Sequence, residues 1–218
     1  MFIRMVLCFV VFYSPNLSAA VDINQLWVRG DLAASEQRMR SALADAEGDD
    51  ALIIQTQMAR VFVFRRDFRG ARDLLIQAKP KLGTASRAAK ARYWLEFGRT
   101  YASHQHQDAD RTSDTQARAR VAFETALALA NDAGNDGLAV DALHMFAFVD
   151  RDPADQLRWN ERALARVESS SQKEAKRWEA SIRNNLGETL FELRRFPPAL
   201  TQFERALALG GPKRLAPA

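Results

Sequence analysis

Two histidines lie one residue apart in a polar stretch, His104-x-His106, and Asp108 and Asp110 follow them closely. Two imidazoles and two carboxylates form a ligand set that suits zinc or copper. The stretch is therefore a candidate metal- or ligand-responsive sensor. The competing interpretation is an ordinary surface loop, because polar loops are rich in aspartate and offer no fixed geometry. The third histidine, His144, stands alone and is expected to be a hydrogen-bonded, partly buried side chain.

No spacing typical of a catalytic site is present elsewhere in the chain. The sequence lacks Gly-x-Ser-x-Gly, His-Glu-x-x-His and a glycine-rich phosphate loop. Its one cysteine, Cys8, lies in the apolar N-terminal stretch, so the remainder has no thiol for a disulfide, a metal or a nucleophile. We therefore expect a non-catalytic protein without a cofactor and without a metal, with His104 and His106 as the weaker metal alternative.

Composition and charge are those of a folded, soluble domain. The chain has 218 residues, 47% of them hydrophobic and 27% charged, with a formal charge of +4. Without residues 1–20, which hold one arginine and no acid, 30 basic and 27 acidic side chains remain. This mild excess favours acidic partners, but it lacks the dense basic stripe typical of nucleic-acid binding. We expect no nucleic-acid partner.

Residues 1–20 are typical of a secretory signal peptide. Arg4 precedes an apolar run, Met5 to Tyr13, and Ser18-Ala19-Ala20 supplies small residues at the expected cleavage spacing. The alternative is a membrane anchor, although the apolar run is about half of the roughly 20 residues that a spanning helix needs. We expect cleavage after Ala20 and an exported protein, periplasmic if the source is a bacterium, without a membrane span afterwards.

Residues 21–218 contain a degenerate repeat of about 34 residues. In the unit that starts at Ala180, small residues fall at positions eight, twenty and twenty-seven, and a large apolar residue falls at twenty-four. These residues are Gly187, Ala199, Ala206 and Phe203. A unit that starts at Leu52 places Ala59, Ala71, Ala78 and Leu75 at the same positions without a gap. A period of this length indicates a stack of helix pairs.

Further units fit the pattern less completely. A unit near Ala91 begins Trp94-x2-Phe97-Gly98-x2-Tyr101, and its second helix fits after nine extra residues within 103–116. In a fourth unit His144 occupies position eight, where a small residue is expected. Residues 31–46 resemble a lone second helix that caps the array. The expected units are therefore residues 31–48 as a half repeat, 52–85, 91–133, 137–168 and 172–211, all within one domain.

These spacings resemble the tetratricopeptide repeat family over roughly residues 31–209. The resemblance implies an all-α fold, a solenoid of antiparallel helix pairs with about four to four and a half repeats. It also implies a concave groove lined by positions two, five, nine and twelve of each first helix. Carried onto this sequence, those positions are Ile53, Thr56, Arg60 and Val63; Arg92, Leu95, Arg99 and Ala102; and Ser181, Asn184, Glu188 and Phe191. The lysines and asparagines of the family's carboxylate clamp are not reproduced.

Residues at the ends of apolar stretches predict several helix boundaries. Glycines at 48, 83, 134 and 210–211 are expected to end helices. Asp152-Pro153 is expected to begin a helix, and Ser171-x-x-Glu174 predicts a capping box for a long helix that runs to about Arg194. Trp178 on that helix is either a packed anchor or an exposed contact.

The sequence favours an exported scaffold or adaptor that binds a peptide or protein, of acidic character, in the concave groove. Its candidate groove residues are Arg60, Val63, Arg92, Arg99, Asn184, Glu188 and Phe191. Arginine suits this task because its guanidinium can donate two parallel hydrogen bonds to one carboxylate. One alternative is a structural subunit of an envelope complex or a homo-oligomer, and the other is the histidine-loop sensor.

Overall fold

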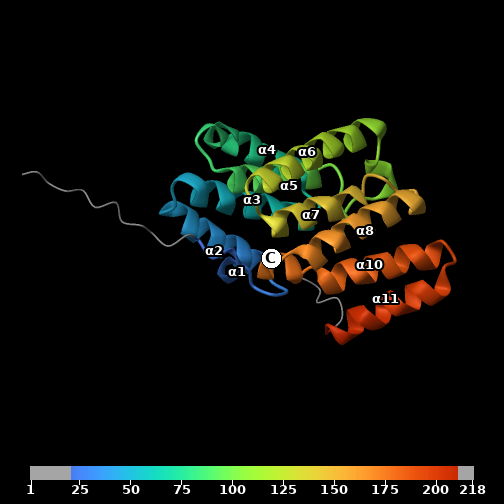
Figure 1. Cartoon of the computed structure of the whole chain (residues 1–218). Coiled ribbons are helices and arrows are strands. Elements are labelled where there is room, and N and C mark those ends of the chain that lie inside the picture. The colour runs from blue at the N-terminus through green and yellow to red at the C-terminus, as the bar shows by residue number, and fades with distance from the viewer. Residues whose placement is uncertain (1–20, 211–218) are drawn as a thin grey trace, which may run out of the picture.

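The computed structural model describes residues 21–210, and every regular element in that range is a helix (Figure 1). The expected signal peptide and Gly211 lie outside the described residues. No helix of the described range is long and apolar enough to cross a bilayer. The all-α fold expected from the repeat spacing is thus confirmed.

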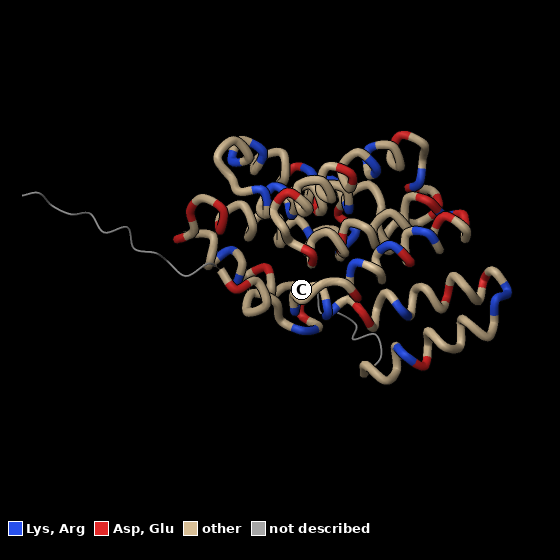
Figure 2. The backbone as a smooth tube through the Cα atoms, viewed as in Figure 1, with Lys and Arg blue, Asp and Glu red and all other residues tan. Residues whose placement is uncertain are grey.

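The helices form antiparallel pairs that stack into an elongated array. The pairs are α3 (Gly48–Phe64) with α4 (Phe68–Ala78), α5 (Arg87–Arg99) with α6 (Ser113–Asp132), α7 (Asp136–Phe146) with α8 (Pro153–Ser169), and α10 (Glu179–Glu192) with α11 (Phe196–Ala208). The remaining elements are α1 (Ile23–Leu26), α2 (Leu32–Ala44), α9 (Lys173–Lys176) and the 3-10 turns η1 (Lys79–Gly83) and η2 (Asp108–Asp110). First helices α3, α5 and α7 also pack on one another, which makes the array a solenoid. Basic and acidic residues are interspersed over it (Figure 2).

Small residues at position eight allow the two helices of a pair to approach closely. A Cβ built on Gly98 of α5 would lie 2.3 Å from Cε1 of Phe123 on α6, and one on Gly187 of α10 would lie 2.6 Å from Cε1 of Phe203 on α11. Both phenylalanines occupy position twenty-four. The first pair has alanine and leucine at these two positions, and both are fully buried in one cluster. Glycine thus accompanies phenylalanine, and alanine accompanies leucine.

The two gap-free units also turn in the same way between their helices. Arg66 and Arg194 both occupy position fifteen, and both have a positive φ, of 64° and 58°. In each turn the next residue donates its backbone N–H back across six residues, Asp67 to Phe62 at 2.9 Å and Arg195 to Leu190 at 2.8 Å. This left-handed C-terminal stop is the one that usually recruits glycine. Its recurrence at one repeat position supports the equivalence of the units.

Several predicted helix boundaries are confirmed, and the one at Gly48 is wrong. Asp152 caps α8 with Pro153 in its first turn. Gly134, at φ 61°, follows α6, and Gly210, at φ 92°, follows α11. Gly48 does not end a helix, because α2 ends at Ala44 and Gly48 is the first residue of α3.

The long helix expected before Arg194 is interrupted. Instead of one helix capped by Ser171 and Glu174, the chain forms the single turn α9, breaks at Arg177 and Trp178, and begins again as α10. The residue before α9 is Gln172, whose side chain accepts a hydrogen bond from the backbone N–H of Asp136 at 2.9 Å. That contact fixes α9 against the start of α7, so it does not project beyond its neighbour as a continuous helix would.

The nine-residue insertion between α5 and α6 is not a plain surface loop. His106 is buried, its ring stacks on Phe68 at 3.8 Å, and Ser103 and the Thr100 carbonyl lie within hydrogen-bond distance of its two ring nitrogens. The stacking of His106 on Phe68 therefore fixes the insertion to α4, although the composition of the insertion is polar.

The N-terminal cap is a helix, as expected, with an additional segment before it. Met39 of α2 is fully buried. Ahead of α2, the indole of Trp27 is buried and donates to Gln57 Oε1 of α3 at 3.2 Å. This attachment holds α1 beside the first helices of the array.

Candidate functional site

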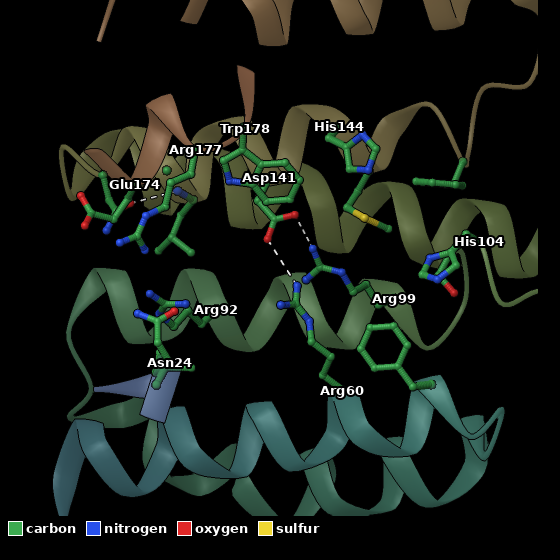
Figure 3. Close-up of a pocket in the computed structure, with 18 of the residues that line it drawn as sticks. Asn24, Arg60, Arg92, Arg99, His104, Asp141, His144, Glu174, Arg177 and Trp178 are labelled. Carbon is green, nitrogen blue, oxygen red and sulfur yellow. Dashed lines mark hydrogen bonds and ion pairs between the residues drawn. The ribbon is translucent and has the colours of Figure 1, made fainter. Parts of the chain in front are cut away.

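A cavity of about 850 Å³, here called the main cavity, opens along the side of the array formed by the first helices. Its walls come from α1, α3, α5, α7 and α9, from the segments that follow α5 and α7, and from the break between α9 and α10. It is thus built from segments more than 150 residues apart in the sequence. The side chains drawn in Figure 3 converge from these helices on a charged centre with aromatic rings to one side.

Four buried charged side chains form one network in the wall of the main cavity. Arg60 of α3 lies between Glu96 of α5, with Nε 3.1 Å from Oε1, and Asp141 of α7, with Nη2 3.5 Å from Oδ2. Arg99 of α5 contacts the same two carboxylates, with Nη1 2.7 Å from Glu96 Oε1 and a second ion pair to Asp141. Two of these contacts, Arg60 and Arg99 to Asp141, are drawn in Figure 3. The network joins three successive first helices.

Mutual pairing favours the ionised forms of Asp141 and Arg99 despite their burial. Burial by itself would raise the pKa of Asp141, but the charges of Arg99 and Arg60 lower that pKa below its ordinary value. Burial would likewise lower the pKa of Arg99, yet Asp141 and Glu96 raise it. A buried charge that loses its partner is costly, by about 3–5 kcal/mol. The network is therefore expected to act as a unit.

Two arginines of this lining, the half-buried Arg92 and the exposed Arg177, lack such a partner in the described range, and Arg92 lies beside the network. Among residues 21–210 no carboxylate lies within ion-pair distance of its guanidinium. Burial and the neighbouring charge of Arg60 lower its pKa from the ordinary value, but a guanidinium stays protonated in proteins. With Arg60 and Arg99, it makes three buried or half-buried cations against two carboxylates. Among these buried and half-buried groups, guanidinium groups therefore outnumber carboxylates by one, while the exposed Asp22, Glu174 and Arg177 also line the cavity.

A line of aromatic rings borders the charged centre. The ring centroid of His104 lies 5.9 Å from that of Phe64 and 6.4 Å from that of Phe148. The ring of His144 lies 5.3 Å from Phe148 and 5.5 Å from Trp178. We call these five residues the aromatic belt. Rings in this position offer flat apolar faces beside the charge.

His144 is neutral at ordinary pH. Burial lowers its pKa from 6.5 to about 4, and Asp141 opposes this shift while Arg99 and His104 add to it. The Nδ1 atom lies 3.2 Å from Nδ2 of Asn185 on α10. Because an amide nitrogen only donates, Nδ1 accepts here and the proton of the neutral ring is on Nε2. This environment agrees with the prediction that His144 is a hydrogen-bonded, partly buried side chain.

A second cavity of about 480 Å³ is bordered by four of the five residues of the aromatic belt. His104, His144, Phe148 and Trp178 line both cavities, so the two are adjacent. The polar side chains of the second cavity come from α8, α10 and the loops before α6 and α8. They are Arg111, Arg151, Gln156, Asn160, Ser181, Asn185, Glu188, Thr189 and Glu192.

The structure separates the predicted groove residues into three groups. Arg60, Arg92 and Arg99 all line the main cavity, and Glu188 lines the second. Asn184 and Phe191 line neither cavity; Asn184 donates to Glu188 at 2.8 Å, and Phe191 is exposed beside Phe196. The placement of Val63 in the groove is wrong. It is 3% exposed and packs between α3 and α4, because α3 turns that side toward its partner helix.

His104 and His106 have separate environments. His106 points inward against Phe68, whereas His104 belongs to the aromatic belt. Within the described range no group of three or more His, Cys, Asp or Glu side chains is placed to hold a metal ion. The alternative in which the two imidazoles and the nearby aspartates share one metal site is not supported.

Several residues of the cavity could have been found by applying the repeat positions to the degenerate unit as well. In the unit that starts at Gly137, positions two, five, nine and twelve are Leu138, Asp141, Met145 and Phe148, and all four line the main cavity. The unusual His144 at position eight obscured this register. Glu96 occupies position six of its unit. The groove positions two, five, nine and twelve therefore do not predict that it belongs to the site.

No protein-family model matches the chain, and no curated protein is significantly similar to it. Function therefore has to be inferred from the chemistry of the two cavities.

Proposed function

We propose that this protein is a non-catalytic binding protein that holds an acidic segment of a peptide or protein partner in the main cavity. The observation that carries this proposal is Arg92, a half-buried guanidinium without a carboxylate partner in the described range. A carboxylate of the ligand would supply the missing counter-charge through two parallel hydrogen bonds. The other buried arginines of the wall, Arg60 and Arg99, are already engaged by Glu96 and Asp141, and the remaining lining arginine, Arg177, is exposed.

The size and extent of the site favour a chain-like ligand. A cavity of about 850 Å³ falls within the range of roughly 300–1,000 Å³ found for small-molecule sites. However, the second cavity is adjacent and shares four lining residues with it, and the walls of the two extend from α1 to α10. An extended peptide covers about 3.3–3.6 Å per residue, so a short segment can reach both cavities.

The state of the buried carboxylates supports a binding rather than a catalytic role. A general base works best with a pKa near the working pH. The pKa of Asp141 is lowered instead, because Arg99 and Arg60 stabilise its ionised form. A carboxylate held in this way orients arginines and is a poor proton acceptor.

The site is consistent with export of the protein as a repeat-type adaptor. We propose that residues 1–20 are removed after Ala20 and that the mature protein acts outside the cytoplasm, in the periplasm if the source is a bacterium. In support, Val21 already contacts the folded array, where its backbone N–H donates to Asp50 Oδ1 at 3.2 Å. The tetratricopeptide-type repeat is likewise proposed from the spacings and from the two glycine–phenylalanine pairs.

The test uses acetylated, amidated hexapeptides that carry one or two central glutamates, each compared with its glutamine twin by calorimetric titration. We expect the glutamate peptides to bind at least tenfold more tightly. Arg92→Gln should remove that preference, because a hydrogen bond to a charged group contributes about 1.5–3 kcal/mol. Arg69→Gln, at an exposed position on α4, is the matched control and should bind like wild type. Equal binding of the twins, or equal effects of the two variants, would refute the proposal.

A second candidate function is self-assembly through the C-terminal helix pair. Large apolar side chains are exposed there on α10 and α11: Phe191, Phe196, Leu200, Leu207 and Leu209. We propose a second copy of this chain as the occupant of this surface. The second helices α6 and α8 are each covered by a following helix, whereas α11 packs appreciably only on α10 in the described range. The mass of the protein in solution tests this candidate.

A further inference from the structure

The second cavity is lined by two arginines, Arg111 and Arg151, and by two glutamates, Glu188 and Glu192. Glu188 and Glu192 lie one turn apart on α10, both exposed and both lining the cavity. The two arginines of the lining are held elsewhere, since Arg111 and Arg151 both contact Asp108 Oδ1, at 3.0 and 2.8 Å. The carboxylates of α10 are thus the charges available to a ligand.

A buried acceptor in the same lining has no donor. Asn160 of α8 is 2% exposed, and its Nδ2 donates to Thr189 Oγ1 at 3.2 Å. Its Oδ1 is the one buried side-chain polar atom between residues 21 and 210 that has no hydrogen-bond partner. An unpaired buried acceptor costs about 1–3 kcal/mol. Asn160 is itself a lining residue of the second cavity, so a hydrogen-bond donor of a ligand that reached this oxygen would relieve that cost.

Aromatic faces complete the environment. Trp178 and Phe148, which line both cavities, present rings to the second cavity as well as to the first. A cation placed over such a face is attracted by the ring, and tryptophan is the best platform. Carboxylates, an unpaired acceptor and aromatic rings together match an ammonium or guanidinium group.

We infer that the second cavity binds a basic side chain, lysine or arginine, of the same peptide whose acidic side chain sits at Arg92. This inference rests on the proposed function and specifies its ligand. The preferred ligand is a segment with an acidic and a basic residue separated by the width of the aromatic belt. Neighbouring rings of the belt are 5.3–6.4 Å apart, so a spacer of one to four residues covers the relevant range.

The experiment compares acetylated, amidated peptides of the form Glu-(Gly/Ser)n-Arg, with n from one to four, with twins in which citrulline replaces arginine. Citrulline keeps the shape of the side chain and most of its donors but has no charge. We expect the arginine peptide to bind five- to tenfold more tightly at the best spacing. The fluorescence of the protein's tryptophans, which include Trp178 in the belt, and calorimetry are the two readouts.

Variants assign the preference to the second cavity. Glu188→Gln combined with Glu192→Gln should bring the arginine and citrulline peptides to within twofold of each other. The double variant Glu161→Gln with Glu204→Gln makes the same change of charge at exposed positions outside both linings and should leave the preference intact. Arg92→Gln should weaken both peptides by the same factor, because it acts on their shared glutamate.

The outcomes separate this inference from the proposed function. If the arginine and citrulline peptides bind equally at every spacing while both still depend on Arg92, the basic site is refuted and the proposed function remains. Equal binding of these two peptides with a loss on replacing either residue by glycine would indicate a neutral donor site and would also overturn the inference. If no peptide depends on Arg92, the proposed function itself fails.

Discussion

At the scale of single residues, His144 connects the two cavities. Its ring contacts Phe148 and Trp178 of the belt, its Nδ1 faces Asn185, and Asp141 of the buried network lies three residues before it on α7. The charged groups that influence it are Asp141, Arg99 and His104. A proton on this ring would therefore add a positive charge beside buried groups among which guanidinium groups already outnumber carboxylates.

We predict that His144 makes the protein less stable in mild acid. Its pKa is about 4 in the fold and about 6.5 in an unfolded chain. As the pH falls below 6.5 the unfolded chain takes up a proton that the folded protein does not, so the free energy of unfolding decreases until about pH 4. The expected loss from this residue is roughly 2 kcal/mol between pH 7 and pH 4.5.

Denaturant unfolding of wild type and His144→Gln at these two pH values measures this effect. Glutamine cannot titrate, so the variant should lose less stability on acidification, while the contributions of the carboxylates appear in both proteins. The NMR titration of the His144 ring gives the pKa directly. Parallel pH profiles for the two proteins, or a ring that titrates near 6.5, would contradict the prediction.

The sequence could predict the arginines of the site but not their state. Arg60, Arg92 and Arg99 follow from repeat positions, because a helix places residues three and four apart on one face. Which of them are neutralised depends on Glu96 and on Asp141, and Asp141 lies more than 40 residues away. The burial of His106 against Phe68 likewise depends on a contact between distant segments. No local pattern reports such contacts.

At the scale of helices, the pairs at positions eight and twenty-four set how closely the two helices of a unit pack. We predict that Gly98→Ala destabilises the protein by about 1–3 kcal/mol through overpacking. Alanine is the better helix former by about 1 kcal/mol, but its Cβ would lie 2.3 Å from the ring of Phe123. Phe123→Leu added to Gly98→Ala should recover part of the loss, because the pair then resembles Ala59 and Leu75.

A double-mutant cycle by denaturant unfolding measures that coupling. Gly83→Ala is the control, since a Cβ there meets nothing within 4 Å and the backbone does not require glycine. That variant should be as stable as wild type or more so. Additive effects of Gly98→Ala and Phe123→Leu would show that the two positions do not pack as proposed.

The break between α9 and α10 illustrates what local signals miss at this scale. Ser171 and Glu174 have the spacing of a capping box, but the side chain that determines the geometry is Gln172, which accepts from Asp136 and donates to the Gly134 carbonyl at 2.7 Å. These contacts tie α9 to the turn between α6 and α7. A glutamine side chain that forms hydrogen bonds with backbone groups far away in the sequence leaves no characteristic spacing of residues by which it could be predicted.

At the scale of the whole molecule, the array of helix pairs was predictable because two units repeat the same small and large residues without a gap and the others repeat them in part. The two cavities were not, because their walls combine α1 with first helices from every pair. The N-terminal segment 21–24 lines the main cavity although the repeat begins only after it. Residues 21–24 reach the main cavity only because the folded array brings them there, and the repeat pattern contains no information about that contact.

The open end of the array predicts self-association. Phe196, Leu200 and Leu207 of α11 are spaced by four and seven residues and so share one helix face, and Leu207 is 75% exposed. In the preceding pair the second helix, α8, is covered by α10, whereas α11 has no such cover in the described range. We therefore expect α11 of one copy to pack on α11 of another about a two-fold axis. Such an interface is self-complementary and closes at a dimer.

Sedimentation equilibrium over a range of concentrations should give twice the chain mass for the mature protein. The double variant Leu200→Glu with Leu207→Glu should be monomeric, because two carboxylates per copy would be buried without partners at the shared face. Val121→Glu with Ile76→Glu is the matched control, since these side chains are similarly exposed on α6 and α4, and it should remain dimeric. A monomer at all concentrations, or a dimer that survives charges on α11, would exclude this surface and leave peptide binding as the function to pursue.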